Sequence, residues 1–236
     1  MAKYKRVILK LSGEQFQGKR DYGIDAEFLH WIAGEVKKVV STGTDVIIIV
    51  GAGNLIRGAS FSKNGIERTT ADYMGMLGTI MNGMALTDVL EQNDQPTRLM
   101  TRLSASSVAE PYIRRRALRH MEKGRVVIIA GGTGNPYVTT DTAAVLAASE
   151  LGADAVLKAT KVDGVYDKDP ETNPDAKKFD EVDISQALEN QDIKVMDKAA
   201  IAMAQEEGLE IIVFNLKEEG NIARAAAGER IGTKVS

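Results

Sequence analysis

The 236-residue sequence contains no cysteine, which excludes disulfide bonds and zinc–thiolate sites and agrees with a reducing cytosolic environment. No apolar stretch approaches the roughly 20 residues that a membrane-spanning helix needs. The short apolar run near the N-terminus has no cleavage site after it. We therefore expect a cytoplasmic protein without a membrane partner. Repeats and low-complexity linkers are also missing, so one domain over residues 1–236 is predicted.

Neither sign of charge is in large excess, since the formal net charge is only −3 at pH 7. Such a balance provides no overall attraction to nucleic acid, and we expect no nucleic-acid partner. Two common nucleotide motifs are absent as well. The sequence has no G-x-x-x-x-G-K-[ST], and Ile56 occupies the third glycine position of a G-x-G-x-x-G pattern that begins at Gly51. These absences exclude a P-loop NTPase and a Rossmann dinucleotide site, so an anionic ligand needs another kind of local site.

The most informative stretch that is present runs from an apolar segment into a glycine-rich one. Residues 126–130 are apolar and mostly β-branched, as in a strand buried on both faces of a parallel sheet. Glycines follow between residues 131 and 134, and residues 139–141 (TTD) precede an alanine-rich helix expected over residues 142–150. A strand, a glycine loop and a helix N-terminus form an arrangement that binds phosphate. The alternative is an ordinary β–α turn in which Asp141 merely caps the helix.

A second glycine loop favours the phosphate-binding interpretation. Residues 45–50 (DVIIIV) are another apolar strand, and Gly51, Ala52, Gly53 and Asn54 follow it directly. Open α/β sheets bind ligands at the carboxyl ends of their parallel strands. Two such loops therefore predict two phosphate-bearing groups at one edge of the sheet.

Strands alternate with helices along the whole chain, which predicts a mostly parallel sheet with helices on both faces. The expected strands are residues 7–11, 45–50, 97–100, 126–130, 153–157 and 211–214, and the expected helices are residues 25–43, 72–91, 110–123, 142–150, 193–207 and 220–227. The helix over residues 72–91 is rich in methionine and glycine. We interpret it as a helix packed in the core rather than against a second subunit.

Two charged residues are candidates for chemistry. Lys10 lies at the end of the first strand, where an ammonium group suits the neutralisation of phosphoryl oxygens, although a solvated strand end is the alternative. Asp141 lies among N–H groups that favour phosphate. A carboxylate there is better suited to holding lysines or Mg²⁺ than to binding an anion.

Six motifs occur in an order that resembles the bacterial uridylate kinases, a branch of the amino acid kinase family. They are KLSG (residues 10–13), GAGNLIRG (51–58), ADYMGM (71–76), GTGNPYVTTD (132–141), KATKVDGVYDKDP (158–170) and KVMD (194–197). ADYMGM and TGNPYVTTD distinguish this branch from acetylglutamate, glutamate and aspartate kinases of the same fold. The resemblance implies a three-layer α/β/α sandwich, assembled as a homohexamer, that transfers the γ-phosphoryl group of MgATP to UMP in pyrimidine nucleotide biosynthesis.

The same resemblance implies the substrate-binding residues. For ATP they are Lys10, Leu11, Ser12, Gly13, Gly53, Arg57, Thr160, Tyr166 and Asp169. For UMP they are Ala52, Asp72, Thr133, Gly134, Asn135, Pro136, Tyr137, Val138, Thr139 and Thr140. The chemistry of these side chains is suitable, because Asp72 can accept two hydrogen bonds from a ribose diol and Arg57 offers a planar fork to phosphate.

The implied mechanism needs positioning and charge neutralisation rather than a base, since a nucleotide phosphate is already anionic. We assign Lys10 to transition-state charge, Asp141 to orienting Lys10, and Lys194 to a second cation by analogy with other kinases of the fold. Lys194 is equally interpretable as a solvated residue before a helix. Mg²⁺ is expected mainly on the nucleotide phosphates, and no protein ligand is assigned to it.

Family regulation is implied as well, with GTP as activator and UTP as inhibitor. The segment matching a GTP-responsive region consists of Gly18, Lys19, Arg20, Asp21, Tyr22 and Gly23. Ala52 stands where many relatives have the middle one of three glycines, and a modest change in UMP affinity is expected from it. Two other functions remain open: a kinase with a carboxylate or carbamate acceptor, and a non-catalytic protein of the same fold that binds a nucleotide or an oxyanion.

Overall fold

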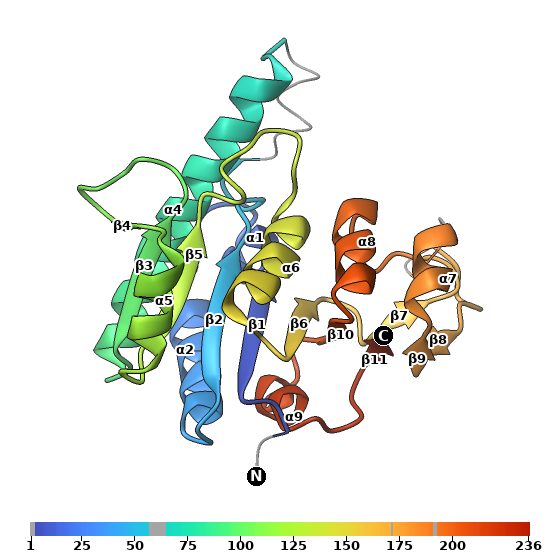
Figure 1. Cartoon of the computed structure of the whole chain (residues 1–236). Helices are drawn as coiled ribbons and strands as arrows, with labels where there is room; N and C mark the ends of the chain where they lie inside the picture. The colour runs from blue at the N-terminus through green and yellow to red at the C-terminus, as the bar shows by residue number, and fades with distance from the viewer. Residues whose placement is uncertain (1–2, 57–64, 171, 191–192) are drawn as a thin grey trace.

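Four neighbouring parallel strands form the centre of the structure. They are β1 (Arg6–Leu11), β2 (Asp45–Val50), β5 (Val126–Ala130) and β6 (Ala155–Thr160), paired in the order β5-β2-β1-β6. The computed structural model describes residues 3–56, 65–170, 172–190 and 193–236 (Figure 1). Arg57, one of the expected ATP ligands, lies outside the described residues.

Within the described residues the main sheet has nine strands, in the order β4-β3-β5-β2-β1-β6-β10-β11-β9. One side is extended by β3 (Thr97–Thr101) and β4 (Glu110–Pro111). The other side is extended by β10 (Glu210–Asn215), β11 (Thr233–Val235) and β9 (Glu181–Val182). Every neighbouring pair is parallel except β10 with β11. A separate antiparallel pair consists of β7 (Val165–Tyr166) and β8 (Lys178–Phe179).

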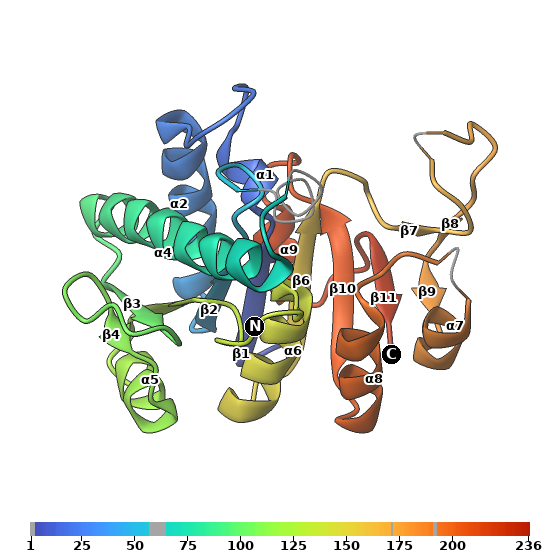
Figure 2. The ribbon, with the colours of Figure 1, turned by 90° about the horizontal axis from the view of Figure 1, so that it is seen from above.

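Helices cover both faces of this sheet, as Figure 2 shows from above. One layer contains α1 (Gly13–Phe16), α2 (Ala26–Val40), α4 (Arg68–Gln92) and α9 (Asn221–Ala226). The opposite layer contains α5 (Arg114–Met121), α6 (Thr140–Leu151), α7 (Ile184–Glu189) and α8 (Lys198–Glu206). Strand side chains alternate between the two apolar cores, which is why the central strands are apolar at almost every position. The predicted three-layer α/β/α fold is confirmed.

Most element boundaries follow from local signals in the sequence. Asp25 caps α2 by accepting hydrogen bonds from the backbone nitrogens of Glu27 (2.9 Å) and Phe28 (3.4 Å). Thr139 caps α6, which begins at Thr140, two residues before the predicted start. Asp141 therefore lies in the first turn of the helix. The left-handed φ of 66° at Gly152 ends α6.

Two expected helices begin later than the sequence predicts. The segment expected to start a helix at residue 110 forms strand β4 instead, and α5 begins only at Arg114. Pro111 lacks an N–H, which is tolerated on an edge strand such as β4. The helix expected from residue 193 begins at Lys198, because Asp197 caps it by accepting from the backbone nitrogen of Ala200 at 3.0 Å.

The prediction that the methionine-rich helix is packed in the core is wrong for one face of it. Met76 is buried, but Tyr73, Leu77, Met81 and Met84 are 42–53% exposed. Their spacing places them along one side of α4, and we call these four residues the α4 stripe. Only the opposite side of α4 packs on the sheet, and the N-terminal part of the helix extends beyond the edge of the sheet (Figure 1).

Candidate active site

Lys10, Asp141 and Lys158 form a compact ionic cluster at the carboxyl edge of the sheet. Lys10 on β1 and Lys158 on β6 are direct neighbours in the parallel register. The Nζ of Lys10 lies 2.7 Å from Oδ1 of Asp141, and the Nζ of Lys158 lies 2.8 Å from Oδ2. All three side chains are at most 16% exposed. The structure therefore brings together the predicted pair Lys10 and Asp141 and adds a second lysine to it.

The cluster carries one net positive charge when all three groups are ionised. Burial opposes ionisation of Asp141, but the charges of Lys10 and Lys158 outweigh it and hold the pKa of the carboxyl below its usual range. Burial lowers the pKa of Lys158, and the nearby Lys10 acts in the same direction, while Asp141 opposes them. Asp141 thus keeps two like charges close together in a poorly solvated place. Such an arrangement is suited to an anionic ligand.

The segment at residues 194–197 fastens this cluster from the α8 side. The backbone oxygen of Val195 accepts a hydrogen bond from the Nζ of Lys158 at 2.5 Å. Asp197 accepts hydrogen bonds from the hydroxyl of Thr139 and, at 2.9 and 3.0 Å, from that of Thr142. Because Thr139 caps α6, Asp197 joins the first turn of α6 to that of α8.

The turn after β1 and the first glycine loop pack so closely that neither Gly13 nor Gly51 has room for a side chain. A Cβ added to Gly13 would lie 2.1 Å from the backbone nitrogen of Gly53, and one added to Gly51 would lie 2.7 Å from that of Gly13. Gln15 ties the turn to β6, since its side chain accepts from the nitrogen of Ser12 and donates to the oxygen of Ala159, both at 2.9 Å. The loop after β5 uses glycine differently: Gly131, Gly132 and Gly134 have φ values of 81°, 57° and 79°.

A cavity of about 160 Å³ lies where the two glycine loops meet α4. It is lined by Ala52, Ile56, Ala71, Asp72, Gly75, Met76, Thr79, Gly132, Val138, Thr139 and Thr140. Five of the residues expected to bind UMP are among these: Ala52, Asp72, Val138, Thr139 and Thr140. Thr133 lines a neighbouring cavity with Arg102, and Gly134, Asn135, Pro136 and Tyr137 form the bend between.

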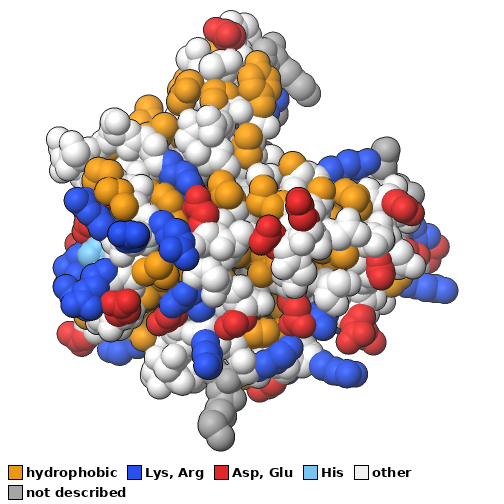
Figure 3. Space-filling model, in the orientation of Figure 1, with side chains coloured by type: hydrophobic (Ala, Val, Ile, Leu, Met, Phe, Trp, Pro, Cys, Tyr) orange, Lys and Arg blue, Asp and Glu red, His pale blue; other side chains and the backbone are white. Residues whose placement is uncertain are grey.

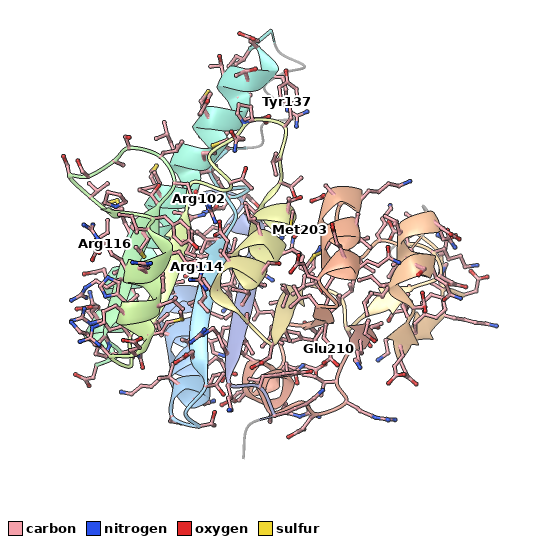
Figure 4. All side chains as sticks on the ribbon, in the orientation of Figure 1. Arg102, Arg114, Arg116, Tyr137, Met203 and Glu210 are labelled. Carbon is pink, nitrogen blue, oxygen red and sulfur yellow. The ribbon has the colours of Figure 1, made fainter. Side chains whose placement is uncertain are left out.

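Asp72 fastens this bend to α4. Its carboxylate accepts from Nε of Arg68 at 2.8 and 2.9 Å and from the backbone nitrogen of Tyr137 at 2.8 Å. The guanidinium of Arg68 lies over the Tyr137 ring, 5.4 Å from its centroid. Figure 4 shows Tyr137 at the outer end of the loop, beside α4. A ribose that binds Asp72, as predicted, therefore competes with these contacts.

Tyr166 and Asp169, two of the three residues expected to border the adenine nucleotide, lie at a second cavity, of about 230 Å³, whereas Thr160 is not among the residues that line it. Its lining includes Val162, Tyr166, Lys168, Asp169 and Lys194. The hydroxyl of Tyr166 donates to Oδ1 of Asp163 at 2.5 Å. Lys194 thus lies with Tyr166 and Asp169, and its assignment as the second cation beside Lys10 stays a prediction.

Sequence reasoning missed Lys158 and Asp197 as members of the site. Both occur within the quoted motifs, but neither has a sequence neighbour that reveals its role. Lys158 meets Lys10 only because β1 and β6 are adjacent in the sheet, although they are far apart in the chain. The available signal was that two lysines each lie at or near the end of an apolar strand.

In the described part of the chain, no group of three or more His, Cys, Asp or Glu side chains is arranged to hold a metal ion. Both oxygens of Asp141 face lysines.

Among residues 3–56, 65–170, 172–190 and 193–236, no helix is both long enough and apolar enough to cross a bilayer.

Comparison with known proteins identifies the family to which this site belongs. The model of the amino acid kinase family matches residues 5–215. The chain is a member of the amino acid kinase family. The amino acid kinases similar to it include the UMP kinase from Bacillus anthracis, with 40% identity, a TM-score of 0.94 and coverage of 99% of this chain and 96% of that one.

A second similar structure is the UMP kinase from Ureaplasma parvum, with 32% identity, a TM-score of 0.92 and 98% coverage of both chains. The uridylate kinase from Archaeoglobus fulgidus is more distant, with 27% identity, a TM-score of 0.76 and full coverage of both chains. The resemblance drawn from the six motifs is thereby confirmed.

Proposed function

We propose that this amino acid kinase transfers the γ-phosphoryl group of ATP to UMP, producing ADP and UDP in pyrimidine nucleotide biosynthesis. The observation that carries the proposal is the buried Lys10–Asp141–Lys158 cluster, which lies at the sheet edge where two glycine loops converge. Family membership and the similarity to UMP kinases support the acceptor.

In the proposed reaction a phosphate oxygen of UMP attacks the γ-phosphorus of ATP. The bond from that phosphorus to the β–γ bridging oxygen breaks, and its electron pair leaves on ADP. The acceptor oxygen is already anionic, so no side chain needs to remove a proton. Lys10 and Lys158 neutralise charge on the transferred group, and Asp141 holds both ammonium groups in place before the substrates bind.

The residues present fit a Mg²⁺ ion that arrives with the nucleotide. Asp141, the carboxylate at the centre of the cluster, is occupied by the two lysines, so phosphate oxygens would supply most ligands. When bound, the ion would neutralise charge on the β- and γ-phosphates. Lys10, Leu11, Ser12, Gly13 and Gly53 would hold these phosphates from the protein side, with the nucleotide base near Thr160, Tyr166 and Asp169.

UMP is proposed to occupy the cavity between α4 and the loop after β5. There Asp72 would exchange its contacts with Arg68 and Tyr137 for the ribose hydroxyls. Binding of UMP would therefore release the backbone nitrogen of Tyr137 from the carboxylate of Asp72. Activation by GTP through residues 18–23, inhibition by UTP and a cytosolic location stay predictions.

We also propose that the protein is a homo-oligomer in which a second copy covers the α4 stripe. Four large apolar side chains, 42–53% exposed and in one line, are unusual for a free surface. Figure 3 shows hydrophobic side chains gathered over the upper part of the molecule, where Figure 1 places the projecting end of α4. A helix face of one copy can pack against the same face of another in a two-fold contact. A hexamer with dihedral symmetry would contain two-fold contacts of this kind.

The deciding experiment measures ADP formation from MgATP with UMP, CMP, dUMP and N-acetylglutamate offered separately. Turnover with UMP and not with N-acetylglutamate is expected. A preference for N-acetylglutamate would support a carboxylate acceptor instead. UMP binding without turnover, unchanged by Asp141→Asn, would support a non-catalytic binding protein.

A further inference from the structure

The buried face of α4 carries two polar side chains, Thr79 and Asn82, one helical turn apart. Thr79 is 3% exposed and Asn82 is fully buried. Polar groups are costly in a helix face that packs on a sheet unless each finds a hydrogen-bond partner. The hydrogen-bond partners of Thr79 and Asn82 therefore show which parts of the chain these two residues hold in place.

Thr79 bonds to the loop after β5. Its hydroxyl donates to the oxygen of Met76 at 2.6 Å and accepts from the backbone nitrogen of Gly131 at 2.7 Å. Gly131 is the first residue after the strand and has a φ of 81°. Thr79 thus fixes the peptide at which the loop leaves the sheet.

Asn82 bonds to the other loop. Its Nδ2 donates to the oxygen of Gly51 at 2.7 Å and to Oδ1 of Asn54 at 2.7 Å, while its Oδ1 accepts from Nδ2 of Asn54 at 3.0 Å. Asn54 is 1% exposed, and its Nδ2 also donates to the oxygen of Gly23 at 2.8 Å. The reciprocal amide pair therefore holds both ends of the Gly51–Asn54 turn.

We propose that Thr79 and Asn82 are positioning residues for phosphoryl transfer, which through one rigid helix set the separation between the two glycine loops. The inference rests on the proposed function, because it takes the loop after β5 as the UMP loop and the loop after β2 as shared by ATP and UMP. In-line transfer depends on the distance between donor and acceptor, so an error of 1 Å in loop separation lowers the rate.

Substitutions of Thr79 and of Asn82 should affect the KM values for UMP and ATP differently. This difference distinguishes a positioning role from a general loss of stability, which would affect both substrates alike. Of the two loops, Thr79 hydrogen-bonds only the UMP loop, whereas Asn82 hydrogen-bonds only the loop that contains Ala52 and Gly53. Thr87 is a matched control on the same helix, because its hydroxyl donates only to the oxygen of Gly83, at 2.8 Å. Thr79→Val leaves the Gly131 N–H without its acceptor, while Thr87→Val affects no loop.

The test is steady-state kinetics of Thr79→Val, Thr79→Ser, Asn82→Asp and Thr87→Val, with thermal unfolding as the check on folding. Thr79→Val should raise the KM for UMP about tenfold and leave the KM for ATP within about twofold, as expected for one lost buried hydrogen bond. Thr79→Ser retains the hydroxyl and should restore the UMP value. Asn82→Asp, which loses both donors, should raise the KM for both substrates and lower kcat.

Three results would overturn the inference while UMP kinase activity stands. They are equal effects of Thr79→Val on the KM for both substrates, no rescue by Thr79→Ser, and kinetics of Thr79→Val and Asn82→Asp that match those of Thr87→Val. A wild-type protein that forms no ADP with UMP would instead overturn the proposed function, and the inference with it.

Discussion

The methyl group of Ala52 lies directly over Gly78 of α4. A Cβ added to Gly78 would lie 2.9 Å from the Cβ of Ala52, closer than two carbon atoms pack. Ala52 is not among the residues with positive φ, so its side chain causes no backbone strain. The alanine in the first glycine loop is therefore accommodated by a glycine on the helix that faces it.

This contact predicts the result of a size exchange. Gly78→Ala should push the first glycine loop away from α4 and raise the KM for UMP about fivefold or more, since overpacking costs about 1–3 kcal/mol. Adding Ala52→Gly to it should restore most of the loss, while Ala52→Gly alone should change KM by less than about threefold. Kinetics and thermal unfolding of the three variants check this. A double variant no better than Gly78→Ala would show that the two positions are not in contact.

Asp141→Asn should abolish most turnover without abolishing UMP binding. The change removes the negative charge that holds Lys10 and Lys158 together. We expect kcat to fall by about 10²-fold or more, as for the loss of other preorganised charges. Calorimetric titration with UMP provides the binding measurement. Asp45→Asn is a matched control, because Asp45 pairs with Arg6 at 2.8 Å at the opposite edge of the sheet. The kcat of the Asp45→Asn variant should equal that of wild type.

Lys158 and Lys194 can be separated by replacing each with methionine, which keeps a long side chain and removes the charge. Lys158→Met should lower kcat about 10²-fold, because Lys158 shares Asp141 with Lys10. Lys194→Met should mainly raise the KM for ATP, since Lys194 lines the cavity with Tyr166 and Asp169. A large loss of kcat from Lys194→Met, with little from Lys158→Met, would return the role of second cation to Lys194.

Glu210 should contribute acid-sensitive stability far from the active site. Partial burial opposes its ionisation, but hydrogen bonds from Tyr4 (2.5 Å), Lys234 (2.9 Å) and Lys3 (3.2 Å) outweigh it and lower its pKa from 4.5 to about 2. A depressed carboxyl pKa stabilises the folded state fully above the unfolded value, and this contribution is lost as pH falls through the folded value.

Between about pH 4.5 and pH 2, wild type should therefore lose on the order of 2 kcal/mol more unfolding free energy than Glu210→Gln. Urea unfolding at a series of pH values measures this difference. Figure 4 shows Glu210 at the opposite end of the molecule from Tyr137, so kcat at pH 7 should be the same in both proteins. Parallel stability curves for the two proteins would contradict the prediction.

An acidic residue in the α4 stripe should dissociate the proposed oligomer. Leu77 is 53% exposed, and Leu77→Asp would place a charge in the middle of the stripe. Sedimentation velocity should show a smaller species than wild type. Ala199→Asp is the control, because it adds the same charge at an exposed position in the first turn of α8. Identical sedimentation of wild type and Leu77→Asp would exclude the stripe as the contact between copies.

The arginines of α5 differ in what they contact. Arg116 points away from the sheet in Figure 4, and Arg119 pairs with Glu122 at 2.8 Å, three positions along the helix. Arg114 instead reaches the backbone oxygen of Glu150 on α6. The sequence alone does not show which arginine of the run contacts a neighbouring helix and which faces solvent, because that depends on which helix packs beside α5.

Local sequence by itself determined the six longer strands, the caps of α2 and α6 and the two glycine loops, but not the short strands β4, β7, β8, β9 and β11. Apolar runs, Asp25 before α2, and glycines after β2 and β5 act over a few residues, where backbone sterics and hydrogen bonding decide the outcome. The six motifs also determined the family. Lys10 and Asp141 were recognisable because each lies beside such a local signal.

Only the tertiary structure decided which of these segments meet. Lys158 lies beside Lys10 because β6 pairs with β1. Thr79 and Asn82 can position the two glycine loops only because α4 packs against both of them. The α4 stripe is exposed because one face of the helix rests on the sheet, which a methionine-rich sequence does not reveal. Contacts between residues far apart in the chain depend on strand order and helix orientation, and no local pattern encodes either.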